Sequence, residues 1–176
     1  MKKELFSSKT SMITQGAIGI ALIFVYFSLF KGPTNIINAL LIPITLFLIS
    51  IKQRKKDIFV LYAAVFIFCL LFFNLQCFFI IFYCCISFLL IIIREKKIGT
   101  ALSALILTIA VTLSFFIAMF LTDHFLGTQM IKIIMAVLKG NTFVYGIMLI
   151  IEGALVGISQ LFISKMLYKR VSRIYN

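Results

Sequence analysis

The chain has few of the side chains that carry catalysis in enzymes. Its 176 residues include only five Asp and Glu residues and a single histidine, His124. His124 stands beside Asp123, but the sequence places no nucleophile and no second metal ligand at a defined spacing from this pair. The sequence also contains no HExxH motif and no glycine-rich phosphate loop. We therefore expect a protein that is not an enzyme and that binds no cofactor and no metal ion.

Cysteine is present, but without the pattern of a metal or redox site. The four cysteines form no CxxC pair and have no histidine near them in the sequence, which excludes the usual zinc and thiol redox motifs. We expect them to be buried as small apolar side chains. A disulfide between Cys69 and Cys77 stays open, because both lie near a predicted hairpin. The cysteines are Cys69, Cys77, Cys84 and Cys85.

Charged residues are scarce and apolar residues dominate. The chain is 63% hydrophobic and 12% charged, and its mean hydropathy is +1.19. A soluble core of this size could not hide so much apolar surface. We therefore expect membrane lipid to surround this chain.

Six apolar runs are long enough, or nearly long enough, to cross a bilayer. A spanning helix needs about 20 residues and about 17 is the short limit, so the second, third and fourth runs are close to that limit. Short connections make most sequential helices antiparallel neighbours. The sequence thus predicts one transmembrane domain, residues 1–176, with the all-α fold of a six-helix membrane bundle. The runs are 12–30, 36–51, 58–73, 77–93, 98–121 and 142–164.

The basic residues lie mostly on one side of these predicted spans. Only Lys31, Lys132 and Lys139 fall on the side opposite the two chain ends. Because Lys and Arg are retained in the cytoplasm during insertion, both termini are predicted to be cytoplasmic. The other fourteen of the 17 basic residues are Lys2, Lys3, Lys9, Lys52, Arg54, Lys55, Lys56, Arg94, Lys96, Lys97, Lys165, Lys169, Arg170 and Arg173.

The net charge of +12 could also indicate nucleic-acid binding. However, the basic residues form short clusters at span ends, and stacking aromatics do not alternate with them. Cytoplasmic retention and contact with anionic lipid explain these clusters better. We therefore expect no nucleic-acid partner.

The connection before the last span is longer than the others. It covers residues 122–141, and its second half, 130–139, predicts a short amphipathic helix that cannot cross a bilayer. This helix lies on the outer surface or folds over the bundle as a lid, and both alternatives stay open. Its predicted apolar face comprises Met130, Ile133, Ile134 and Val137, and its polar face Lys132 and Lys139.

Small residues stand near the start of the first span. Ala17 and Ala21 are one helical turn apart, next to Gly16 and Gly19. Small residues at this spacing let another helix approach closely, which is how helices associate in lipid. The contact is either with a partner protein or within the bundle itself.

Glu152 is the one carboxylate predicted deep inside a span. It lies about ten residues into the last run, close to the middle of the bilayer. A carboxylate there is costly, so it faces the bundle interior, is neutral, or meets a ligand. Gly153 and Gly157 form a GxxxG on an adjacent face, with Tyr145 and Gln160 about two turns away on either side. A purely structural alternative is a hydrogen bond from a neutral Glu152 to Thr108, Thr112 or Ser114.

Together these features resemble the substrate-binding S components of energy-coupling factor transporters. Six helices in a short chain, the pair Ala17 and Ala21, and a longer outer connection before the last helix carry the resemblance. The stretches 13–17 (ITQGA) and 152–157 (EGALVG) look similar to predicted membrane proteins of low-GC Gram-positive bacteria with that fold. The resemblance implies a multi-pass protein of the bacterial plasma membrane that captures a small solute, either vitamin-like or metal-related.

The resemblance also implies two sets of functional residues. Ala17 and Ala21 would dock on the coupling helices of a transmembrane coupling subunit, which works with an ATPase pair. The outer loops and outer helix ends would contact the solute. The candidate solute residues are Tyr145, Asn141, Asp123, His124 and Asn74 in those positions, together with Glu152 deeper in the last span.

The sequence departs from this family in the solute site. No residues match a riboflavin, thiamine, biotin or folate site, and tryptophan, frequent in several such pockets, is absent. The sequence therefore does not name the solute. The alternative function is a non-enzymatic scaffold or interaction protein of the cell-envelope or immunity type. Rod-shape membrane proteins share the helix arrangement, but their expected Gly-rich stretch ending in an intramembrane Asp is not found here.

Overall fold

The computed structural model describes residues 9–30, 35–51 and 53–174, and within these ranges the fold is all-α. Each of the six predicted apolar runs forms a helix. The fifth helix continues five residues beyond its predicted end, to Leu126, where Gly127 adopts a left-handed conformation (φ 64°) and ends it. The elements are α1 (Lys9–Leu29), α2 (Ile36–Ser50), α3 (Lys55–Phe72), the short 3-10 helix η1 (Asn74–Gln76), α4 (Cys77–Glu95), α5 (Thr100–Leu126), α6 (Met130–Val137) and α7 (Thr142–Ile174).

Three of these helices are long and apolar enough to cross a membrane. They cover Asn74–Glu95, Thr100–Leu126 and Thr142–Arg170, and two shorter apolar helices cover Ile13–Leu29 and Ile36–Ser50. Large apolar side chains on their outward faces are exposed, Leu113 and Ile151 by more than half. Such faces suit lipid, so the chain has the character of a membrane-embedded helical protein.

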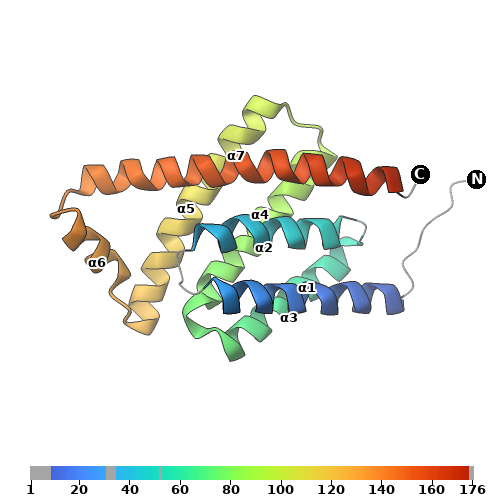
Figure 1. Cartoon of the computed structure of the whole chain (residues 1–176), viewed down its shortest axis with the longest axis horizontal. Helices are drawn as coiled ribbons and strands as arrows, with labels where there is room; N and C mark the ends of the chain where they lie inside the picture. Colours follow the sequence, from blue (N-terminus) through green and yellow to red (C-terminus); the bar gives the residue numbers. More distant parts are fainter. Residues whose placement is uncertain (1–8, 31–34, 52, 175–176) are drawn as a thin grey trace, which may run out of the picture.

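α2 and α4 form the centre of the bundle. α2 packs against α1, α4 and α7, whereas α4 packs against α2, α3 and α5. In Figure 1, α1, α2 and α7 have roughly parallel axes, with α1 antiparallel to the other two, and α4 and α5 cross them obliquely. α6 joins the end of α5 to the start of α7, and we call this side of the molecule the α6 end. The starts of α2, α4 and α7 also lie at the α6 end.

α5 and α7 make the most extensive helix contact, and two glycines of α7 allow it. Gly153 lies directly against the Thr112 side chain. A Cβ atom at Gly157 would come within 2.9 Å of the Leu107 carbonyl carbon and 3.0 Å of the Thr108 backbone nitrogen. The predicted GxxxG pair therefore lets the two backbones touch, which is the usual way in which small residues join helices in lipid.

α2 is joined to α7 by a hydrogen bond that a proline makes necessary. Pro43 lies inside α2 and has no N–H, so the carbonyl of Ala39, four residues earlier, lacks its helical donor. The Gln160 side chain of α7 is fully buried and donates from Nε2 to this carbonyl at 2.8 Å. Because lipid offers no replacement donor, the bond keeps a proline tolerable in the central helix.

The cysteine prediction is confirmed for three residues and wrong for one. Cys69, Cys77 and Cys84 are buried, but Cys85 is exposed because the outward face of α4 carries it. All four thiols are free, so Cys69 and Cys77 form no disulfide.

Replacement of Gly157 by alanine tests the close helix approach. The new Cβ would meet backbone atoms of α5 that cannot move aside as a flexible side chain could. We expect Gly157→Ala to destabilise the protein by about 1–3 kcal/mol, the usual range for overpacking. The effect would be measured as a lower melting temperature in detergent.

Gly146→Ala provides a matched control on the same helix. Gly146 has no atom within 4 Å of its built Cβ, so this substitution adds a methyl group without a clash. We expect it to leave the melting temperature unchanged or to raise it through better helix propensity. Equal melting temperatures for the two variants would show that the close approach of Gly157 to α5 does not contribute to stability.

Candidate functional site

Buried polar side chains gather towards the α6 end of the bundle. The Asn38 side chain is fully buried, and its amide nitrogen donates to the Phe30 carbonyl at 2.8 Å, which holds α2 to the end of α1. Among the described residues, several buried oxygens in this region have no hydrogen-bond partner. They are Asn38 Oδ1, Gln76 Oε1, Tyr83 Oη and Tyr145 Oη. Because unpaired buried polar groups are costly, this region is the best candidate for binding a polar solute.

Glu152 and Tyr145 belong to this polar region. Glu152 is half-buried on α7, and its carboxyl lies near the hydroxyls of Tyr83 and Tyr145. Tyr145 is buried about two turns closer to the α6 end and lies near Asp123 as well. Asp123, Tyr145, Tyr83 and Glu152 therefore make a polar path from the α6 end into the bundle.

The structural alternative for Glu152 is a hydrogen bond to a hydroxyl of α5. One of them, Thr112 Oγ1, donates instead to the Leu149 carbonyl at 3.4 Å. Another, Ser114, lies beside Tyr83 in the interior between α4 and α5.

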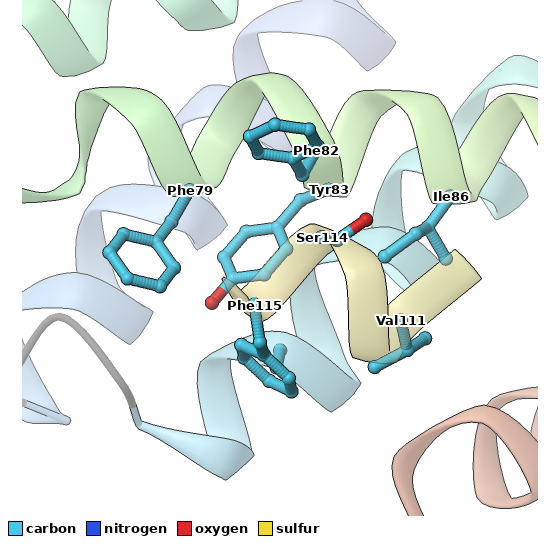
Figure 2. A pocket seen from close by; sticks show the side chains of 8 residues that line it. Phe79, Phe82, Tyr83, Ile86, Val111, Ser114 and Phe115 are labelled. Atoms are coloured by element: carbon cyan, nitrogen blue, oxygen red, sulfur yellow. The ribbon is translucent and has the colours of Figure 1, made fainter. Parts of the chain in front are cut away.

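Tyr83 occupies a crevice between α2, α4 and α5. Figure 2 shows its hydroxyl end between the rings of Phe79 and Phe115, with Phe82 on the other side of the Tyr83 ring. The crevice is packed so closely that it leaves no room for a water molecule. Preformed ligand pockets commonly have volumes of about 300–1,000 Å³, so this site is closed in the conformation that the structure shows. The lining residues are Ala39, Phe79, Phe82, Tyr83, Ile86, Val111, Ser114 and Phe115.

Asp123 fixes the start of α6. One carboxylate oxygen accepts from the Thr128 hydroxyl at 2.5 Å and from the Met130 N–H at 2.6 Å, and the other accepts from the Ile131 N–H at 2.8 Å. A carboxylate that accepts three hydrogen bonds and donates none is in its ionised form. The charged carboxylate therefore acts as a cap for a helix whose own N-cap residue, Gln129, supplies no side-chain bond.

α6 is the short helix predicted within 130–139, but its predicted apolar face is wrong in part. Ile133 and Val137 point outward and are 61% and 77% exposed. The face that packs on the core is rotated from the predicted one, because α6 is apolar nearly all round and the Asp123 cap sets its rotation. Met130 is half-buried near this face, and the residues packed on the core are Ile131, Ile134, Met135 and Leu138.

The other predicted solute residues lie on the surface. His124 is exposed, with its ring parallel to Phe120 at 6.2 Å and edge-on to Phe125 at 5.0 Å. Asn141 accepts from the Val144 N–H at 3.1 Å and so caps α7, and Asn74 is exposed in η1. The polar path thus includes three of the six predicted residues.

Sequence reasoning missed Asn38 and Tyr83. Both are polar residues inside apolar runs, which is a signal that the sequence does contain. Tyr83 lies near Glu152, and Asn38 lies against the end of α1. Both positions depend on packing between different helices, which the sequence pattern does not give. Within the described ranges no group of three or more His, Cys, Asp or Glu side chains could hold a metal ion.

The small residues of α1 divide between two faces. Gly16 packs against Leu61 of α3 and Gly19 against Ile49 of α2, so the glycines serve contacts within the bundle. Ala17 and Ala21 are exposed on the other face of α1. In Figure 1, α1 lies at the edge of the molecule, and its main contacts are with α2 and α3. The exposed alanine face is therefore accessible to another helix.

Comparisons with protein-family models, with curated proteins and with solved structures give no match for this chain. The features that bear on its function are therefore the polar path and the exposed face of α1.

Proposed function

We propose that this protein is a multi-pass plasma-membrane subunit that binds a small solute for an ATP-driven importer of the energy-coupling factor type. The observation that carries the proposal is the exposed pair Ala17 and Ala21 on α1, at the spacing that a partner helix needs. The solute would be vitamin-like or metal-related. The partners would be a transmembrane coupling subunit and an ATPase pair.

In this function α1 to α5 and α7 would all be membrane spans, with both chain ends in the cytoplasm. α5 and α7 have 27 and 33 residues, or roughly 40 and 50 Å, and exceed a bilayer core of about 30 Å, so both would cross with a tilt. The oblique crossing of α5 over α7 in Figure 1 fits such tilts. Fourteen of the 17 basic residues then lie in the cytoplasm, and the α6 end faces outward.

The α1 face suits a helical partner in lipid. Ile13 and Ile18 beside the alanines are 67% and 55% exposed, so this face of α1 carries small and large apolar side chains together. In lipid, apolar area alone gives no preference for a partner, whereas small residues one turn apart allow close van der Waals contact with another helix. The same helix uses its glycines for the bundle, which leaves the alanines for the partner.

The polar path would receive the solute under α6. Glu152 and the hydroxyls of Tyr83 and Tyr145 offer donors and acceptors in a low-dielectric interior, where hydrogen bonds to a solute are strong. Because the crevice at Tyr83 is closed, the solute enters only if α6 or the neighbouring side chains move. α6 is short and is held at its start by Asp123, so it is suited to act as the lid.

One observation favours the second candidate, a membrane scaffold. The interior beside Tyr83 is filled, as expected for a protein whose role is to hold partners and not to enclose a solute. In that function the α1 face would still bind a helix, but the partners would be cell-envelope assembly proteins.

Replacement of Ala17 by tryptophan tests the proposed docking. The tagged protein would be purified in mild detergent from membranes of its own cells, and co-purified proteins and ATPase activity would be measured. We expect an ATPase pair and a coupling subunit with the parent protein, and loss of both with Ala17→Trp, because the large ring prevents close helix approach.

Leu113→Trp serves as the control, because Leu113 is exposed on α5, away from the alanine face. We expect this variant to keep its partners. The docking proposal is wrong if Ala17→Trp retains the ATPase pair, and recovery of cell-wall synthesis proteins in its place supports the scaffold.

Glu152→Gln tests the solute site. The amide keeps the size and polarity of the side chain, so the melting temperature should stay unchanged. Radiolabelled water-soluble vitamins and transition-metal ions would first be screened for uptake by cells with the parent protein, which identifies the solute. We expect cells with Glu152→Gln to lose uptake of that solute. Glu152→Ala should lower the melting temperature, because it removes a half-buried side chain and leaves a gap in the packing. Full uptake by Glu152→Gln would show that Glu152 has only a structural role.

A further inference from the structure

A second feature lies at the end of the bundle opposite α6. A cavity of about 240 Å³ opens between α2, the end of α4, the connection from α4 to α5, and α7. Its size is sufficient for a phosphate group with part of a glycerol backbone. The lining residues are Phe47, Leu90, Ile93, Arg94, Lys97, Ile98, Leu161, Ser164, Lys165 and Tyr168.

The charges around this cavity are all positive. Arg94, Lys97 and Lys165 line it, and no acidic side chain of the described residues does. Within the described ranges, none of these three cations forms an ion pair, since the ion pair there joins Arg54 and Asp57. Three like charges around one hollow repel one another, so an anion in the hollow would relieve that repulsion.

Neutral contacts hold two of the cations in place. The Lys165 ammonium donates to the Thr100 hydroxyl at 2.9 Å, and the Arg94 guanidinium lies 3.2 Å from the centre of the Tyr168 ring. Neither contact neutralises charge. The two groups come from α7 and α4, so they face the hollow from different helices.

The inner wall of the cavity is apolar. Phe47, Leu90 and Leu161 are buried there in the core of the bundle. A cationic rim above an apolar wall matches a phosphate group that carries hydrocarbon below it. Free phosphate would use the rim alone.

We propose that this cavity binds the phosphate group of an anionic phospholipid. Arg94 and Lys165 contact the phosphate oxygens, Lys97 adds positive charge, and the start of an acyl chain lies against the apolar wall. Basic pockets between membrane helices on the cytoplasmic side are a recognised means of binding anionic headgroups. The proposal is independent of the solute and of the transport partner.

A neighbouring cavity provides the control. It has a volume of about 320 Å³ and is lined by Lys55 and Lys96, but Glu95 lines it as well. The acidic side chain lowers the positive charge of this second cavity. Loss of Lys55 and Lys96 therefore removes the same formal charge from the same end of the molecule without touching the proposed site.

Native mass spectrometry of the purified protein in a neutral detergent tests the proposal. The probes are phosphatidylglycerol, phosphatidylcholine with the same acyl chains, and inorganic phosphate, in separate titrations. We expect phosphatidylglycerol to bind most tightly, and Arg94→Gln with Lys165→Gln to weaken it by about thirtyfold, because two cations near the phosphate are lost. Lys55→Gln with Lys96→Gln should change this affinity less than twofold.

Each outcome decides the proposal. Equal binding of phosphatidylglycerol and phosphatidylcholine, or unchanged binding of phosphatidylglycerol by the double variant, would overturn it. Binding of inorganic phosphate as tight as that of phosphatidylglycerol, lost in the double variant, would show a free-phosphate site and also overturn the lipid assignment. If the double variant does not fold, Lys165→Gln alone gives the test, because Lys165 is exposed and its bond is to the exposed Thr100 hydroxyl.

Discussion

A backbone carbonyl without its helical donor is the constraint on which the arrangement of this bundle depends. Pro43 removes the donor for Ala39 in the central helix α2, and in lipid no solvent molecule replaces it. Gln160 of α7 provides the bond, and Gly153 and Gly157 of the same helix let α5 touch α7 at the backbone. α7 thus packs against both α2 and α5, through a hydrogen bond to α2 and a close backbone approach to α5.

The two candidate sites lie towards opposite ends of α7. Towards the α6 end, α7 carries Tyr145 and Glu152 on the polar path. Near its other end it carries Lys165 and Tyr168 at the basic cavity. Because Gln160 and the two glycines lie between these ends, the contacts that fix α7 also fix both sites. A shift of α7 against α5 would therefore change the polar path and the basic cavity together.

The sequence predicts the local features of this fold and leaves the long-range ones undetermined. Apolar run length locates all six long helices, and the short helix within 130–139 follows from its pattern. The rotation of α6 does not follow, because its apolar residues allow more than one stripe and the Asp123 bonds choose between them. The pairing of Gln160 with Ala39 joins residues 121 positions apart, and no local pattern predicts it. In the candidate site, Glu152 is conspicuous as a lone carboxylate, whereas Tyr83 comes near it only because α4 and α7 both pack against α2 and α5.

A double-mutant cycle on Pro43 and Gln160 tests the central constraint most directly. Pro43→Ala returns an N–H to α2, so the Ala39 carbonyl then has a helical donor and no longer needs Gln160. The free energy of unfolding in detergent would be measured for Gln160→Leu, Pro43→Ala and the double variant. We predict that Gln160→Leu is destabilising alone and less so with Pro43→Ala, with a coupling of about 0.5–1.5 kcal/mol. Additive effects of the two substitutions would contradict the account.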